Sequence, residues 1–382
     1  MSVLDSGAFP RMWGNDVSAN DRELELGLFM PNCSNMSAIS TYRIVDDEWP
    51  YEQNKRIAIA AEKADFKLLF PVSRWRGFGG ETDYLGTSLE TMTWASGLLE
   101  ATSKIKIFST VHVPVFHPVV VAKMGATLDH ISQGRWGINL VSGWSEGEFG
   151  MMGIELDEHE ERYQRTAAFI EILRGLWSEP PGTFDYDSKW YQIKGGYSLP
   201  QPPTQPPIAN AGSSEDGKNM TAKHCDWSFL STPSLDATGA IVDDIKGRAA
   251  ALGRTVRTAA FPFVLWRDSE DEAHAEIQRI IDNKDAVAAK NWMDGAKIGS
   301  GSFDQFTLDM FTVGAGAVHV VGTREQVAEK LKGLFDSGID GVLMVFQAFL
   351  DDTERFARDI SPLLREMGVI KSSTTDSATA AE

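Results

Sequence analysis

The sequence of 382 residues contains 36 Lys and Arg against 54 Asp and Glu, which gives a formal net charge of −18 at pH 7. This acidic balance argues against a protein that grips nucleic acid through its phosphates, because such binding depends on Lys and Arg. Apolar residues make up 42% and charged residues 24% of the chain, as in ordinary globular proteins, so a disordered or fibrous protein is excluded.

The chain begins with a segment that we interpret as an N-terminal extension, residues 1–23, because it lacks the basic region and apolar core of a secretory signal. One domain is expected over 24–368, followed by a small polar tail at 369–382 that we expect to be disordered. No stretch approaches 18 consecutive apolar residues, so no membrane span is predicted. Two cysteines, Cys33 and Cys225, are too few for a disulfide framework and favour a reducing, cytoplasmic location.

Short apolar runs alternate with longer amphipathic stretches along most of the chain. The predicted strands are 25–30, 66–72, 105–111, 135–141, 206–211, 226–231, 258–266 and 340–346. The predicted helices are 51–64, 88–102, 117–131, 159–177, 214–223, 234–252, 269–283 and 323–337. The nearly continuous apolar character of the strands is typical of a parallel sheet that is buried on both faces. Eight strands in alternation with helices predict a (β/α)8 TIM barrel, with a doubly wound open sheet as the alternative.

Two segments depart from the alternation and are predicted to be insertions. Residues 179–205 are rich in Pro, Gly and aromatic residues, which favours a surface excursion. Residues 284–320 lie between the seventh and eighth predicted strands. Because insertions between barrel strands and helices commonly cover the site, we expect 284–320 to form a lid.

The segment GSSEDGKN at 212–219 follows the predicted strand 206–211 and nearly matches a phosphate-binding loop. It ends in Asn219 and so lacks the hydroxyl that holds Mg²⁺ in an NTP-hydrolysing site. Small residues and free N–H groups at a helix start can still hold a phosphate. The alternative is an ordinary strand-to-helix turn that is capped by Ser213 or Ser214.

The histidines form no recognisable metal motif. HEERY at 159–163 has a tyrosine where a zinc-binding H-E-x-x-H motif has its second histidine. His112 and His117 flank VPVF at a spacing that does not suit a single metal ion. We therefore predict no metal site.

Two loops that follow predicted strands carry residues suited to a ligand. RWRGFGGETDY at 74–84 combines arginines, glycines and aromatic residues where barrel active sites are built, although a solvent-exposed turn is the alternative. GINLVSGW at 137–144 places the polar Asn139 in an apolar strand, where it either bonds neighbouring backbone or faces a ligand. Neither a G-x-S-x-G elbow nor a dinucleotide-binding G-x-G-x-x-G after the first strand is present. These residues indicate a barrel with a phosphate-bearing ligand, without naming a reaction.

In the same segments the sequence resembles the bacterial-luciferase-like flavin monooxygenases. The resemblance is carried by GLFMPN, ATSKIKIFSTV, HPVVVAKMGATLDHISQGRWGINLVSGW, HEERYQRTAAFIEILRGLW and NAGSSEDG, in the family's order, and covers roughly residues 24–368. WRGFGGETDY and NLVSGW look most like the pyrimidine monooxygenases. GEF followed by HEERY looks equally like the dimethyl-sulfone and alkanesulfonate monooxygenases.

The resemblance implies a barrel that receives reduced FMN (FMNH2) from a separate NAD(P)H-dependent flavin reductase and uses O2 to oxygenate a small substrate. The flavin-binding positions carried over from the family are Ser73, Arg74, Asn139, Glu148, Arg162, Tyr163 and Ser214. Of these, Arg162, Tyr163 and Ser214 match the positions that hold the phosphate.

A catalytic pair is also implied by the resemblance. Thr110 and Asn139 match the two residues that flank the oxygen-reacting edge of the flavin in the pyrimidine enzymes. A hydroxyl and an amide are groups that can hold a flavin peroxide by hydrogen bonds while leaving it reactive. Trp144 matches a residue that lines the substrate pocket of those enzymes.

The sequence differs from the pyrimidine enzymes at several positions, so the identity of the substrate stays open. PNCSNMS after the first strand, Ser-Gly before Trp144 and WSEGEF around it differ from their pattern. We expect a two-component FMNH2-dependent monooxygenase with an N-heterocycle as the favoured substrate and a sulfone or alkanesulfonate as the alternative. A deazaflavin-dependent oxidoreductase and a non-catalytic flavin-binding protein are further alternatives. A homo-oligomer, either dimer or tetramer, is expected.

Overall fold

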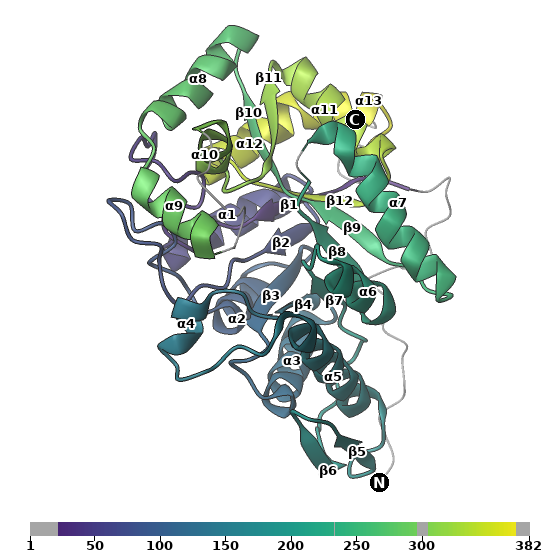
Figure 1. Cartoon of the computed structure of the whole chain (residues 1–382). Coiled ribbons are helices and arrows are strands. Elements are labelled where there is room, and N and C mark those ends of the chain that lie inside the picture. Colours follow the sequence, from purple (N-terminus) through teal and green to yellow (C-terminus); the bar gives the residue numbers. More distant parts are fainter. Residues whose placement is uncertain (1–21, 233, 296–304, 372–382) are drawn as a thin grey trace, which may run out of the picture.

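A computed structural model describes residues 22–232, 234–295 and 305–371 of the chain. Eight parallel strands close into a barrel in the order β1-β12-β9-β8-β7-β4-β3-β2 (Figure 1). The barrel strands are β1 (Glu25–Phe29), β2 (Leu68–Phe70), β3 (Lys106–His112), β4 (Trp136–Val141), β7 (Ile208–Asn210), β8 (Trp227–Leu230), β9 (Arg257–Ala260) and β12 (Gly341–Met344). Because β1 pairs with both β2 and β12, the sheet is closed. The predicted (β/α)8 barrel is confirmed, and the open sheet is excluded.

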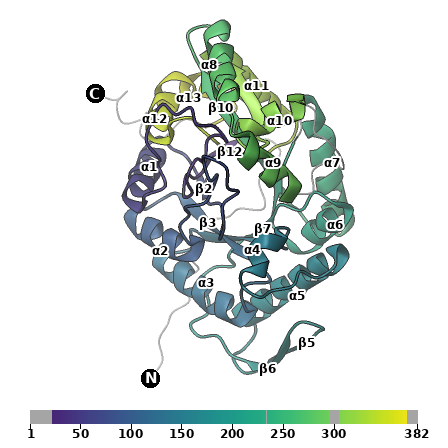
Figure 2. The same ribbon diagram turned by 60° about the vertical axis from the view of Figure 1, so that its left-hand side comes forward.

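Helices surround the barrel on its outer side (Figure 2). They are α1 (Tyr51–Lys63), α2 (Thr91–Ala101), α3 (Pro118–Ser132), α5 (His159–Ser178), α6 (Glu215–His224), α7 (Leu235–Ala251), α11 (Arg324–Asp336), α12 (Phe349–Asp359) and α13 (Ser361–Glu366). The eight predicted helical segments are confirmed, with ends within three residues of those in the structure. The sequence did not predict α12 and α13, which follow the last barrel strand.

Side-chain caps fix where several helices begin. The side chains of Glu90, Ser214, Ser234, Ser269 and Thr323 each accept a hydrogen bond from a backbone N–H in the first turn of the helix that follows. Such a bond satisfies one of the N–H groups that a helix leaves without an internal partner. The local sequence therefore sets the helix starts.

The inside of the barrel is filled by apolar side chains from successive strands. This inner cluster consists of Leu68, Phe70, Phe108, Ala209, Trp227, Ala259 and Leu343. The rings of Phe70 and Phe108 are 4.8 Å apart between centroids. Full burial of one such side chain stabilises a protein by about 1.5–3 kcal/mol, so the filled interior is a rigid base for the strand ends.

The predicted strand 258–266 is two strands in the structure, which corrects the prediction. β9 stays in the barrel, whereas β10 (Pro262–Trp266) leaves it and pairs in parallel with β11 (Val318–Gly322). Pro262 has no N–H with which to continue the barrel ladder, in keeping with a break at this point. β11 begins inside the segment 284–320, so that the predicted insertion ends in a regular strand.

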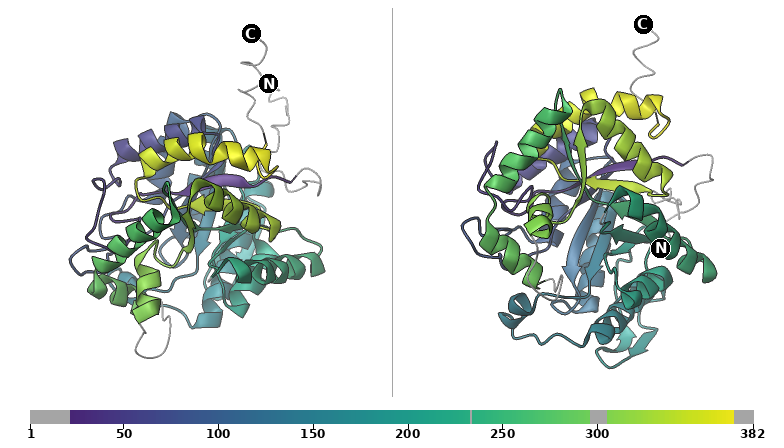
Figure 3. Two further views of the ribbon diagram at one scale, coloured as in Figure 1. Left: turned by 90° about the horizontal axis from the view of Figure 1, so that it is seen from above. Right: turned by 45° about the horizontal axis from the view of Figure 1, so that its top comes forward.

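The remaining elements project from the barrel in two groups. Between β10 and β11 lie α8 (Glu270–Asp282), α9 (Ala286–Gly295) and α10 (Gln305–Thr312). Between α5 and β7 lies an antiparallel hairpin of β5 (Phe184–Asp187) and β6 (Gln192–Gly196), next to α5 (Figure 3). The predicted surface excursion at 179–205 contains this hairpin.

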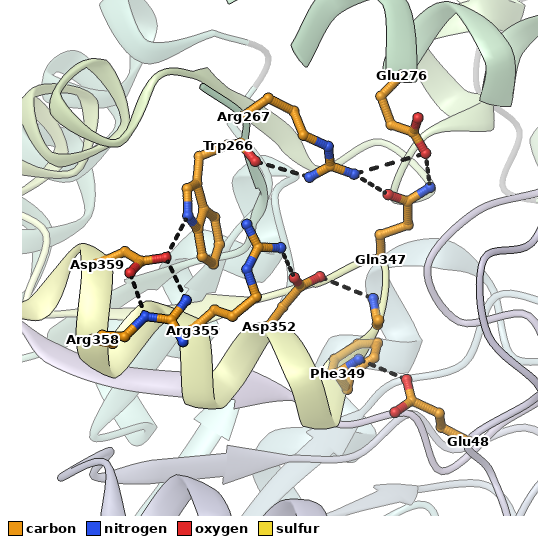
Figure 4. A network of polar contacts seen from close by, with 11 residues as sticks. Glu48, Trp266, Arg267, Glu276, Gln347, Phe349, Asp352, Arg355, Arg358 and Asp359 are labelled. Atoms are coloured by element: carbon orange, nitrogen blue, oxygen red, sulfur yellow. Dashed lines mark hydrogen bonds and ion pairs between the residues drawn. The ribbon is translucent and has the colours of Figure 1, made fainter. Parts of the chain in front are cut away.

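A polar network joins the start of α12 to α8 and to the segment after β1 (Figure 4). Glu48 accepts a hydrogen bond from the backbone N of Phe349 at 2.7 Å. Gln347 accepts one from Arg267 at 3.1 Å and donates one to Glu276 of α8 at 2.7 Å. A carboxylate at a helix N-terminus is favoured by the helix dipole. The network therefore holds α8, and the insertion that follows it, against the barrel.

The predicted extension 1–23 and tail 369–382 lie largely outside the described residues. Within the described residues, no helix is long and apolar enough to cross a membrane. Cys33 and Cys225 are both buried and free.

Candidate active site

The carboxyl ends of the barrel strands surround a cavity of about 680 Å³. Its polar and charged lining includes Ser73, Arg74, Thr110, His112, Asn139, Trp144, Arg162, Tyr163, Asn210 and Ser213. Active sites of (β/α)8 barrels lie at this end, and the volume suits a cofactor together with a small molecule. Seven of the nine predicted site residues line this one cavity, whereas Glu148 and Ser214 lie outside its lining.

Four phenylalanines form an apolar floor to the cavity. Phe70 and Phe229 stack with their ring centroids 5.4 Å apart, and Phe229 stacks on Phe261 at 5.1 Å. Phe29 lies 5.4 Å from Phe229. Aromatic pairs of this kind attract each other beyond the effect of burial. An apolar floor also excludes water, which strengthens the hydrogen bonds made above it.

The predicted lid supplies another wall of the cavity. Trp292 of α9 and Phe311 of α10 both line it, and their ring centroids are 5.0 Å apart. Part of the segment 284–320 therefore lies beside the cavity, and its role as a lid stays a prediction. Residues 296–304 of that segment lie outside the described part of the chain.

The insertion is fastened to the loop after β2. Asn291 of α9 donates a hydrogen bond to the backbone oxygen of Phe78 at 2.7 Å. The carboxylate of Asp285, just before α9, accepts one from the backbone N of Thr82, also at 2.7 Å. The loop 74–84, for which the sequence left a ligand-binding and a solvent-exposed role open, is thus hydrogen-bonded to α9 and to the residue before it.

Thr110 and Asn139 lie directly opposite each other on the neighbouring strands β3 and β4. The Thr110 hydroxyl donates to the backbone oxygen of Pro71 at 2.8 Å, and the Asn139 amide nitrogen lies 3.4 Å from that hydroxyl oxygen. The amide oxygen of Asn139 is buried and has no partner among the described residues. In a buried amide both the NH2 group and the oxygen normally have hydrogen-bond partners, so the unpaired oxygen indicates that a ligand binds in the cavity.

Arg74 and Glu148 form a buried ion pair. The distance from Arg74 Nη2 to Glu148 Oε2 is 2.7 Å, and their side chains are 4% and 1% exposed. Glu148, in α4 (Glu146–Gly150), also accepts a hydrogen bond from the backbone N of Trp75. Burial lowers the pKa of Arg74 and raises that of Glu148, while the opposite charge of each partner counteracts both shifts. Both carboxylate oxygens of Glu148 therefore already have partners, one in the side chain of Arg74 and one in the backbone of Trp75.

Aromatic rings enclose the guanidinium of Arg74. Its central carbon lies 4.8 Å from the ring centroid of Phe78 and 4.8 Å from that of Trp144. These two rings are stacked, with centroids 6.2 Å apart. A guanidinium is attracted to aromatic faces, so Arg74 positions Trp144, the predicted substrate-pocket residue, at the wall of the cavity.

Arg162 and Tyr163 project from the first turns of α5. Arg162 donates from Nη1 to the backbone oxygen of Gly143 at 2.6 Å, and its buried Nε has no partner within the described ranges. The Tyr163 ring packs against Gly212 and Gly217, where a Cβ would lie 2.9 and 3.0 Å from its atoms. The glycines thus let the turn before α6 approach the tyrosine. Two helix N-termini and an arginine here favour an anionic group.

Ser214 caps α6 by accepting a hydrogen bond from the backbone N of Gly217 at 3.2 Å, and Ser213 lines the cavity in its place. The cap is the alternative that the sequence left open for this turn. Asn210, at the end of β7, holds the turn from below. It donates to the backbone oxygen of Leu140 at 2.5 Å and accepts from the N of Gly212 at 2.7 Å. Sequence reasoning missed Asn210, although an amide at the end of an apolar strand was a signal.

His112 is a second residue that the sequence did not assign to the site. It ends β3, lines the cavity and lies edge-on to Phe149 at 5.4 Å. Its Nδ1 is buried without a partner in the part of the chain that the structure describes. Burial, helped by the positive charge of Arg74, lowers the pKa of His112 to about 3. The imidazole is therefore neutral and can exchange hydrogen bonds with a ligand.

We expect His112 to make the stability of the protein depend on pH. The folded protein keeps His112 neutral while the unfolded chain protonates it below its ordinary pKa, so stability falls as the pH drops from about 6.5 towards 3. At pH 5 this group alone costs about 2 kcal/mol. Urea unfolding of His112→Phe should show a loss between pH 7.5 and 5 that is smaller by this amount than in the parent. The exposed His274 of α8 serves as a control, and an equal loss in His112→Phe and the parent would contradict the prediction.

Four lining residues carry buried polar atoms that lack a hydrogen-bond partner within the described ranges. These atoms are Arg74 Nε, His112 Nδ1, Asn139 Oδ1 and Arg162 Nε. Buried polar atoms are almost always paired, so their gathering at one cavity indicates a ligand with several polar groups. The described residues contain no group of three or more His, Cys, Asp or Glu side chains placed to hold a metal ion.

Comparison with known proteins agrees with this geometry. The family model for luciferase-like monooxygenases matches residues 24–341. An FMNH2-dependent dimethylsulfone monooxygenase of Pseudomonas fluorescens is 34% identical over 359 residues, covering 91% of this chain and 96% of the relative. The pyrimidine monooxygenase RutA of Acinetobacter baylyi is 34% identical over 328 residues, covering 82% and 88%.

A solved structure shares the whole architecture. Riboflavin lyase superposes with a TM-score of 0.80 at 21% identity, over 92% of this chain and 93% of that one. This likeness supports the barrel fold, while the sequence matches carry the family assignment. The chain belongs to the luciferase-like monooxygenase family.

Proposed function

We propose that the chain is the oxygenase of a two-component system, which binds FMNH2 and uses O2 to oxygenate a small substrate. The observation that carries the proposal is the Thr110–Asn139 pair, whose unpaired amide oxygen lies in the same cavity as Arg162. Both named relatives are monooxygenases, and the dimethylsulfone enzyme is described as FMNH2-dependent.

The residues around the cavity fit a flavin mononucleotide. Arg162, Tyr163 and the Ser213–Ser214 turn would hold the phosphate, because a guanidinium, a phenol and helix N-termini all favour a dianion. Ser73 and Arg74 would contact the ring system, with the phenylalanine floor excluding water from it. Bound in reduced form, FMN supplies the electrons that activate O2.

Thr110 and Asn139 would position oxygen during the reaction. The hydroxyl is oriented by Pro71, and the amide is held beside that hydroxyl by the register of β3 and β4. Preorganised hydrogen-bonding groups of this kind act without reorganising when charge develops. Glu148 would contribute to the site indirectly, by holding Arg74 in place.

The substrate is proposed to be a small N-heterocycle of the pyrimidine type, with a sulfone as the second candidate. Aromatic side chains, Tyr84, Trp144 and Trp292 among them, line the cavity and suit stacking on a planar ring. The relatives at 34% identity include enzymes named for each of these two classes. A separate NAD(P)H-dependent flavin reductase is proposed to supply FMNH2.

Turnover with different cofactors tests the proposal. The purified chain, mixed with a generic flavin reductase, NADH, FMN and ¹⁸O2, should place one ¹⁸O atom into a substrate such as uracil or dimethyl sulfone, as read by product mass. Reduced deazaflavin in place of the reductase system should give no product. Turnover with the deazaflavin alone would support a hydride transferase instead. Tight FMNH2 binding without oxygenation of any compound in a broad panel would support a flavin-binding protein.

A further inference from the structure

Glu148 forms an ion pair with Arg74 on the cavity wall but does not itself line the cavity. Arg74 lines the wall beside Trp144, whereas its partner Glu148 lies behind it with a side chain only 1% exposed. The pair is fixed on both sides, because Glu148 is bound to the backbone N of Trp75 and Arg74 lies against Phe78. Together the two side chains carry no net charge.

Other charges are scarce around this part of the cavity. Among the described residues that line it there is no carboxylate, and the only other arginine is Arg162. His112 is neutral because burial and Arg74 keep its pKa near 3. His159 also lines the cavity and lies 3.5 Å from the carboxylate of Asp216. Once a phosphate occupies Arg162, the wall around Arg74 and Trp144 therefore presents mainly uncharged polar groups and aromatic rings.

We propose that Glu148 is a specificity residue, which compensates Arg74 so that the site accepts neutral polar substrates and rejects anions such as sulfonates. An anion entering this cavity would lose its hydration without meeting an uncompensated positive charge. A neutral sulfone or lactam loses far less, and the unpaired Nε–H of Arg74 can still donate to its oxygen. Rejection of a competitor by an unfavourable charge balance is a general route to specificity.

This inference rests on the proposed function for the identity of the reaction and narrows its substrate to uncharged molecules. It separates two candidates that the sequence had grouped together, because dimethyl sulfone is neutral and an alkanesulfonate is an anion. The two classes share the S(=O)2 group, so charge is the feature that distinguishes them.

The test compares the binding of dimethyl sulfone and methanesulfonate, which have nearly the same shape. Equilibrium dialysis of labelled ligands, with saturating oxidised FMN to occupy Arg162, requires no turnover. We expect the parent to bind methanesulfonate at least roughly tenfold more weakly than dimethyl sulfone. In Glu148→Gln the uncompensated Arg74 should raise methanesulfonate affinity by roughly tenfold or more, since one buried charge at contact distance acts this strongly. Dimethyl sulfone affinity should change far less.

Three further variants separate charge from structure. Glu148→Asp keeps the carboxylate and should still disfavour methanesulfonate. If Glu148→Gln does not fold, Glu148→Met removes the same charge and takes its place. The double variant Arg74→Met, Glu148→Gln should return to the behaviour of the parent, and thermal melts check that each protein is folded. A parent that binds methanesulfonate as tightly as dimethyl sulfone, or a folded charge-removing variant that gains no affinity for methanesulfonate, would overturn the proposal. Because no product is measured, this result is independent of whether the chain oxygenates a substrate.

Discussion

Replacing Arg162 with alanine is expected to weaken FMNH2 binding by about 1.5–3 kcal/mol, roughly 10- to 150-fold, the range for hydrogen bonds to a charged group. The side chain donates a hydrogen bond to the backbone oxygen of Gly143, and its buried Nε–H has no partner among the described residues. Gly212 and Ser213, in the turn before α6, line the same cavity. A phosphate there would gain a charge-assisted bond from a group that is already oriented. Anaerobic titration of the apoprotein with FMNH2, followed by fluorescence, measures the loss.

Arg165 provides a matched control for this prediction. It lies on the same helix, three residues further on, but its guanidinium is paired with Asp157 and Tyr191 and does not line the cavity. Arg165→Ala should therefore lower the melting temperature without changing FMNH2 affinity. If Arg162→Ala keeps normal affinity while its fold is intact, the phosphate is held elsewhere.

The barrel could be predicted from the sequence because its strands and helices are determined by short local patterns of residues. Each strand is a short apolar run, and several of the predicted helices start close to a cap or a proline that can be read directly, such as Ser214, Ser269 or Pro118. The break at 258–266 could not be predicted in this way. Its apolar residues continue through Pro262, and only the partner strand β11, more than fifty residues later, decides that β10 leaves the barrel.

The candidate site also contains residues that could be predicted from the sequence and residues that could not. Thr110 and Asn139 could be matched because residues at corresponding points of adjacent parallel strands meet at the same height. The resemblance implies that Glu148 contacts the flavin, and the structure adds a hydrogen bond from Arg74, 74 positions away, that spacing did not predict. His112 and Asn210 were missed because their importance depends on which side of a strand end faces the cavity. Such relations depend on tertiary contacts, which spacing alone does not contain.

Asn139→Ala is expected to separate oxygen activation from flavin binding. Loss of one preorganised hydrogen-bonding group at a reacting centre typically lowers the rate by about 10²- to 10³-fold. FMNH2 affinity should stay close to that of the parent, because the phosphate contacts at Arg162 are untouched. Oxygenated product should fall by that factor, while hydrogen peroxide from unproductive oxidation rises to account for the NADH consumed. Stopped-flow oxidation of bound FMNH2 and product yield measure the two effects.

A purely structural role for Asn139 predicts a different outcome. Among the described residues its amide nitrogen makes a side-chain hydrogen bond only to Thr110, at 3.4 Å. Truncation would then cost about 1–3 kcal/mol of stability and leave the yield per flavin unchanged. Asn54 of α1 is a control of this kind, since it is buried outside the cavity lining and accepts a hydrogen bond from Trp94 at 2.8 Å. Asn54→Ala should melt earlier with unaltered coupling of oxygen to product. If Asn139→Ala behaves in the same way, the amide serves the fold and the positioning of oxygen must be assigned to another residue.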